Sequence, residues 1–146
     1  MNISKYLATK QLNVSARGEK FAFPDRLYVA LYNSDPTWND TGQEVSGGGY
    51  GRQVITFAEP AQITVQEFNP ITGVLMSNIQ KMSIRSAADV AFAVATANWG
   101  PVTHFGLRDA ATGGNLYYFG TLETPRSILN NDIFKFLTGQ VEIRLN

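Results

Sequence analysis

Short hydrophobic runs, separated by glycine, proline and asparagine turns, recur along most of the chain. Residues 27–32 (LYVALY) and 116–122 (LYYFGTL) are hydrophobic at nearly every position, which predicts strands that are covered on both faces. Residues 141–145 (VEIRL) alternate strictly between hydrophobic and charged side chains, which predicts a strand with one buried face. The pattern therefore favours strands over helices for most of the chain.

Weaker strand patterns complete this prediction. We expect these strands at residues 52–58, 62–68, 74–85, 89–96, 103–109 and 133–137. In 103–109 the alternation places Phe105 and Leu107 on one face of the strand. His104 and Arg108 fall on the other face, so we expect this strand to be half-exposed.

The strand expected at 89–96 has one face made only of alanines, opposite Val90, Phe92 and Val94. Short strands with frequent turns are typical of an antiparallel sandwich or barrel. We therefore expect residues 1–146 to form a single, mainly β domain. Its expected architecture is an antiparallel, jelly-roll-like β-sandwich with one N-terminal helix.

That helix is predicted within residues 2–17, so that residues 1–18 form an N-terminal helical arm. Asn2 or Ser4 could cap its start, Gly18 could end it, and Tyr6 and Leu7 belong to a loose hydrophobic stripe. A helix of this length is marginal in isolation, so it must dock on another surface. That surface can belong either to its own domain or to a neighbouring subunit.

Residues 34–49 form a long loop that ends in the glycine-rich segment 46–51 (SGGGYG). A phosphate-binding glycine loop needs a Lys-Ser/Thr pair and a following helix, but a strand pattern follows here. The nucleotide-binding interpretation is therefore rejected. A long loop in a compact domain is often functional or packed on a partner. Arg52 at its end is expected to hold loop carbonyls or to pair with Glu44.

Several motifs carry a family resemblance: DPT at 35–37, TGQEVSGGGYGRQ at 41–53, NWGPVTHFGLRDA at 98–110 and TGGNLYYFGTL at 112–122. Together with LYVALY at 27–32, they resemble small virion proteins of tailed bacteriophages, described as tail-fibre-like or minor structural proteins. The segment 61–87 matches this family poorly and looks like a local elaboration. The resemblance implies a structural protein that works as a homo-oligomer, most often a trimer.

Composition narrows the classes of partner. Charged residues make up only 16% of the chain, and 12 basic and 12 acidic residues give a net charge of zero, which argues against nucleic-acid binding. The absence of cysteine excludes disulfides and thiolate metal sites. No hydrophobic run is long enough to span a membrane, so we expect no membrane partner. A phage protein of this kind would be made in the host cytoplasm and end in the virion.

No catalytic, cofactor or metal site is expected from the sequence, and we predict that the chain is not an enzyme. His104 is the only histidine, with no serine and carboxylate placed to form a triad. Asp35, Asp40 and Glu44 share one loop, but their spacing is not that of a calcium loop, and solvated carboxylates are the simpler expectation. Asp109 and Glu123 are too far apart along a predicted hairpin to act as a glycosidase pair.

The candidate interface residues are aromatic or basic, with one leucine: Tyr6, Leu7, Trp38, Tyr50, Arg52, His104 and Arg108. Trp99 is expected to be buried in its own domain. Trp38 lies in the polar loop and is expected either to cover its own domain or to contact a partner. Exposed tryptophan also stacks on sugar rings, so a host surface glycan is a further candidate partner.

These observations predict a structural component of a tailed-phage virion, packed against other virion proteins in the tail, baseplate or fibre region. A capsid decoration (cement) protein is the alternative within the virion. A module that binds a host surface glycan is the alternative from a different functional class.

Overall fold

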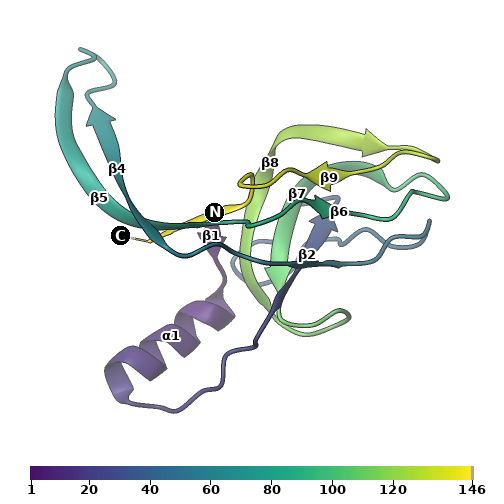
Figure 1. The fold of residues 1–146 in the computed structure, drawn as a ribbon, viewed down its shortest axis with the longest axis horizontal. Coiled ribbons are helices and arrows are strands. Elements are labelled where there is room, and N and C mark those ends of the chain that lie inside the picture. Colours follow the sequence, from purple (N-terminus) through teal and green to yellow (C-terminus); the bar gives the residue numbers. More distant parts are fainter. Residues whose placement is uncertain (146) are drawn as a thin grey trace.

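The computed structural model describes residues 1–145 and confirms a mainly β chain with one N-terminal helix, arranged as a β-sandwich (Figure 1). The helix is α1 (Lys5–Arg17). The strands are β1 (Asn2–Ile3), β2 (Leu27–Tyr32), β3 (Gln53–Ile55), β4 (Ala61–Phe68), β5 (Leu75–Arg85), β6 (Val90–Ala91), β7 (Gly100–Arg108), β8 (Leu116–Ile128), β9 (Lys135–Phe136) and β10 (Glu142–Leu145).

The largest sheet is antiparallel and has the strand order β1-β8-β7-β2-β3. The two continuous hydrophobic runs, β2 and β8, occupy inner positions of this sheet, as their composition predicts. β7 and β8 form a hairpin whose turn contains the glycine pair at 113–114. Gly114 has a φ of 69°, and a Cβ there would collide with the carboxylate of Asp109, so the turn requires glycine at this position.

One face of this sheet packs into the hydrophobic core. Val29, Leu31 and Leu107 project from it and are fully buried. The opposite layer is built from the short pair β6–β9, the segments next to it and the start of β10. Four of its aromatic rings form a chain of edge-to-face and stacked pairs: Tyr50, Phe92, Trp99 and Phe134. This core fixes the sheet from which the 34–52 loop and the 109–115 turn emerge.

Helix α1 lies on the other face of the sheet, next to β8. Ser4 is its N-cap: its hydroxyl accepts a hydrogen bond from the Leu7 amide and donates one to the Leu116 carbonyl. Gly18 ends the helix with a φ of 69°. Leu7 is the helix's only buried residue, so the helix docks on its own domain by its first turns and extends away from it (Figure 1).

β4 and β5 form a long hairpin that projects from the body of the molecule (Figure 1). β10 joins its base by pairing with residues 82–85 of β5, which makes a three-stranded sheet there. Beyond this point β4 and β5 pair only with each other. The turn at the far end of the hairpin spans residues 69–73, where Asn69 accepts hydrogen bonds from two turn amides.

Four of the strand predictions need correction. The strand expected at 52–58 is reduced to β3, the one at 89–96 to β6 and the one at 133–137 to β9. After β6 the backbone leaves regular pairing, so Val94 is exposed and Ala95 is buried, the reverse of the predicted faces. Arg108 is on the predicted face of β7, but this face is covered, because Tyr32 and Leu116 lie over Gly106 beside it. The expectation of a half-exposed strand is therefore wrong for this end of β7.

Candidate functional site

The loop at 34–52 is held by two arginines, each bound to one of its carboxylates. Arg52 donates from Nε and Nη2 to the two oxygens of Glu44, both at 2.8 Å. Its Nη1 donates to the carbonyl of Ala110 at 2.8 Å and to that of Gly113 at 2.7 Å. Both roles that the sequence suggests for Arg52, pairing with Glu44 and holding carbonyls, are confirmed, although the carbonyls belong to the β7–β8 turn.

Arg108 repeats this arrangement from the other side of the same turn. Its Nη1 and Nη2 donate to the two carboxylate oxygens of Asp40 at 2.8 and 2.9 Å. Nη1 also donates to the hydroxyl of Tyr32 at 2.9 Å, and Nη2 to the carbonyl of Gly114 at 2.9 Å. The Arg52–Glu44 pair therefore closes the 34–52 loop on itself, and the Arg108–Asp40 pair joins the loop to β7. The bonds from the two arginines to the carbonyls of residues 110, 113 and 114 connect the loop to the 109–115 turn. We call these four side chains, Arg52, Glu44, Arg108 and Asp40, the double arginine clamp.

Tyr50 links the clamp to the sheet. Its hydroxyl accepts a hydrogen bond from the amide of Leu31 at 3.0 Å and donates one to Glu44 Oε1 at 2.8 Å. Burial alone would disfavour the charged form of Glu44, but hydrogen bonds from Arg52 and Tyr50 outweigh it and hold the pKa of this carboxyl below its ordinary value. The hydrogen bonds from Arg108 to Asp40 likewise outweigh burial and raise the pKa of the Arg108 guanidinium. Glu44 and Arg108 are therefore charged at neutral pH.

This network predicts an acid-dependent loss of stability. Because the pKa of Glu44 is lower in the folded chain than its ordinary 4.5, the unfolded chain binds the proton first as the pH falls. The stability that Glu44 contributes is therefore complete above about pH 4.5 and is lost below it. We expect Glu44→Gln to lower the free energy of unfolding by about 1–2 kcal/mol at pH 7. Urea titrations at pH 7, 5 and 3 measure the free energy of unfolding. The difference in this free energy between variant and wild type should shrink toward pH 3. A difference that is constant with pH would contradict this assignment.

The glycine-rich segment is fixed by Trp99. The indole Nε1 donates to the carbonyl of Gly48 at 2.8 Å, and Trp99 is only 4% exposed, as the sequence predicts. Gly48 has a φ of 58°, and a Cβ there would lie 2.9 Å from two atoms of the indole ring. Glycine at this position therefore allows the loop to lie directly on the tryptophan. The Gly48 carbonyl also accepts a hydrogen bond from the Thr96 amide at 2.9 Å.

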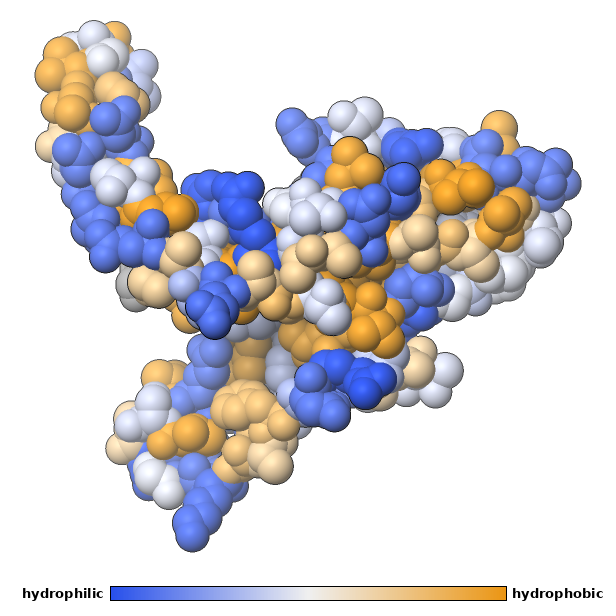
Figure 2. All heavy atoms as spheres, viewed as in Figure 1, coloured by the Kyte–Doolittle hydropathy of each residue, from blue (hydrophilic) through white to orange (hydrophobic). Residues whose placement is uncertain are grey.

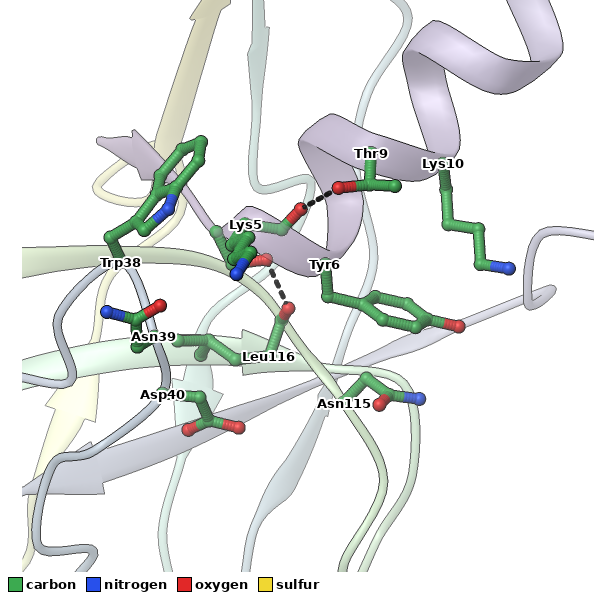
Figure 3. A pocket seen from close by; sticks show the side chains of 10 residues that line it. Lys5, Tyr6, Thr9, Lys10, Trp38, Asn39, Asp40, Asn115 and Leu116 are labelled. Atoms are coloured by element: carbon green, nitrogen blue, oxygen red, sulfur yellow. Dashed lines mark hydrogen bonds between the residues drawn. The ribbon is translucent and has the colours of Figure 1, made fainter.

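The start of α1 and the 34–49 loop lie side by side and border an open cleft of about 480 Å³ (Figure 3). The amide of Lys5 donates to the carbonyl of Trp38 at 3.0 Å, which fastens the helix to the loop. Tyr6 lines the cleft, and its ring lies 5.8 Å from that of Tyr117. Trp38 is 48% exposed. The arm and the loop, predicted as separate candidates, thus form one surface.

The remaining candidates are placed as follows. His104 is partly buried on β7, and its Nδ1 shares a hydrogen bond of 2.7 Å with the Thr103 hydroxyl. Of the loop carboxylates, Asp35 is exposed as expected and accepts from the Thr37 amide at 2.9 Å. Asp40 and Glu44 differ from the expectation, because the clamp binds both of them. Residues 1–145 contain no group of three or more His, Cys, Asp or Glu side chains that could hold a metal ion.

The structure also exposes a surface that the sequence motifs do not single out. Figure 2 shows hydrophobic side chains gathered at the end of the β4–β5 hairpin. Large exposed residues there are Phe68, Ile71, Val74, Leu75 and Met76, and Ile71 is 92% exposed. The signal in the sequence is the segment 68–80, which is free of charged residues and lies within the 61–87 segment that matches the phage resemblance poorly. We call residues 68–76 the hairpin tip.

The polar groups of the double arginine clamp hold a loop and a turn of the chain together, and the hydrophobic hairpin tip faces solvent. The family model described as Podophage GP4 fiber I protein gp80 matches residues 2–144, and the chain belongs to this family. It is therefore a structural component of a tailed-phage virion, one of a fibre protein family whose members contact other virion proteins. No curated protein shows significant sequence similarity to the chain.

The family match runs through the β4–β5 hairpin, the segment where the resemblance to phage proteins is weakest. The hairpin therefore belongs to the matched region together with the clamp and the cleft.

Among residues 1–145, no helix is long and hydrophobic enough to cross a membrane.

Proposed function

We propose that this protein is a non-enzymatic packing subunit in the tail, baseplate or fibre region of the virion, and that its projecting hairpin makes the decisive contacts. The observation that carries this proposal is the hairpin tip, where large hydrophobic side chains face solvent on an element held only at its base. Exposed apolar patches of this kind mark protein–protein contact sites. A two-stranded ribbon is also marginally stable alone, so a partner that covers it adds stability.

The proposal is tested by changing the hairpin tip without touching the core. The triple variant Ile71→Ser, Val74→Ser and Met76→Ser should fold normally, because these side chains are exposed. Phage that lack the gene are grown on a host that supplies wild-type or variant protein, and incorporation is measured by mass spectrometry of purified particles. We expect incorporation of the variant to fall at least about tenfold, since a few central apolar residues dominate most interfaces.

A matched control comes from exposed hydrophobic residues elsewhere on the molecule. Leu129, Ile133 and Leu137 are each about half exposed and lie near the β6–β9 pair. Their triple serine variant should enter particles as wild type does. Normal incorporation of the tip variant would overturn the proposal. Antibody labelling of particles gives the location, and label over the capsid shell in place of the tail would assign the protein as a decoration protein.

A second candidate function is supported by the cleft beside α1. The exposed Trp38 lies next to Lys5 and Asn39, an aromatic platform with polar neighbours that suits a sugar ring, and Asn115 lines the same cleft (Figure 3). Binding of the protein to host polysaccharide that disappears with Trp38→Ala would establish this function. No binding across the host's surface polysaccharides would exclude it and leave the packing role alone.

A further inference from the structure

The two faces of the projecting β4–β5 ribbon differ in chemistry. Directly paired residues of an antiparallel ribbon point to the same face, and successive pairs alternate between faces. One face carries the pairs Gln62–Met82, Thr64–Gln80 and Gln66–Asn78. Part of its hydrogen-bonding capacity is engaged within the ribbon, because the Gln80 oxygen accepts from Gln62 at 2.7 Å and from Thr64 at 3.1 Å. We call this the amide face.

The opposite face has a hydrophobic centre between two opposite charges. Its successive pairs are Ile63–Lys81, Val65–Ile79 and Glu67–Ser77. Lys81 therefore lies toward the base of the ribbon, Val65 and Ile79 lie at its centre, and Glu67 lies toward the tip. Within residues 1–145 neither Lys81 nor Glu67 forms an ion pair. We call this the Lys–Val–Glu face.

We propose that the Lys–Val–Glu face is a self-association surface, on which a second copy of this chain packs face to face with the two ribbons antiparallel. This inference rests on the proposed function, because it names the partner that covers the same hairpin. In the antiparallel arrangement the Lys81 end of one ribbon meets the Glu67 end of the other, and the apolar centres coincide. The surface is its own complement, which is the requirement of a two-fold interface.

The charge order selects this arrangement over the parallel one. Parallel ribbons, as in a three-fold bundle around an axis, would gather the Lys81 side chains at one end and the Glu67 side chains at the other. Like charges placed together oppose association, whereas opposite charges steer and fix the register of the complex. The hairpin thus favours pairs of chains over the trimer that the phage resemblance implies. It also explains why this face has valine and isoleucine at its partly exposed centre, between a lysine and a glutamate.

Charge reversal of purified full-length protein tests the proposal, with mass measured by light scattering over a range of concentrations. Wild type should reach the mass of two chains. Lys81→Glu and Glu67→Lys should each weaken association about tenfold or more, and the double reversal should recover most of the loss, because the two charges change places. Val65→Ser with Ile79→Ser should give monomers. Circular dichroism checks that each variant keeps its β-structure.

The matched control reverses nothing on the proposed surface. Gln66→Glu and Gln80→Lys place the same charges on the amide face and should leave association unchanged. A monomer at every concentration, a three-chain mass insensitive to both reversals, or a double reversal no better than the single ones would overturn the proposal. Failure of the self-association proposal can be distinguished from failure of the proposed function. A monomer that enters particles through its hairpin tip overturns only the self-association. A pair that never enters particles overturns only the packing role.

Discussion

Replacing Trp99 with alanine should lower the free energy of unfolding by about 3–5 kcal/mol, the cost typical of removing a large buried aromatic side chain. Trp99 is 4% exposed and packs against the rings of Tyr50 and Phe92. The substitution also leaves the Gly48 carbonyl without its hydrogen bond from the indole. Both the core and the glycine-rich segment therefore lose a contact. Urea unfolding followed by far-UV circular dichroism measures the effect.

Trp38 provides the control for this experiment, since the chain has only two tryptophans and Trp38 is 48% exposed. Trp38→Ala should change the free energy of unfolding by less than about 1 kcal/mol, as surface substitutions usually do. Equal losses for the two variants would show that Trp99 does not anchor the loop as described.

Replacing Arg108 with alanine is the second substitution with a large expected effect. The guanidinium is buried, and its loss leaves the Tyr32 hydroxyl, the Gly114 carbonyl and a partly buried Asp40 carboxylate without their partner. Removing one member of a buried ion pair costs about 3–5 kcal/mol, but Asp40 is one-third exposed, so we expect about 2–4 kcal/mol. Urea titration at pH 7 measures this loss.

Arg144→Ala is the matched control, because Arg144 is half exposed in its ion pair with Glu142. Exposed pairs contribute about 0–1 kcal/mol, so this variant should be close to wild type. The double variant Arg108→Ala, Asp40→Asn should recover part of the Arg108 loss, since it removes the unpaired charge. A double variant less stable than Arg108→Ala would show that the carboxylate has other support.

Local patterns in the sequence explain which parts of this structure could be predicted. Arg52 and Glu44 are eight residues apart in one loop, so their pairing was a short-range prediction. The helix caps at Ser4 and Gly18 and the turn at 113–114 also follow from local rules. The predicted strand faces are correct where pairing is regular, as between β2 and β7.

The missed features depend on contacts that are distant in sequence. Arg108 and Asp40 are 68 residues apart, and only the folded sheet brings the loop over the end of β7. Arg108 therefore read as an exposed charge on an alternating strand. The hairpin tip was missed for a different reason: a hydrophobic turn has no local signal for whether a core or solvent surrounds it. Only the folded structure, in which the ribbon projects from the sandwich, shows that solvent surrounds this turn.

The double arginine clamp has a consequence for any partner that approaches the Trp38 surface. A loop of sixteen residues would normally have to become ordered when it binds, at a cost of roughly 1–2 kcal/mol for each residue fixed. Here the ion pairs of Glu44 and Asp40 fix the loop in the free protein, and its turn is closed by a 2.7 Å bond from the Thr41 amide to the Pro36 carbonyl. The ordering entropy is spent during folding, so even a small contact area around Trp38 presents a rigid, preorganised surface.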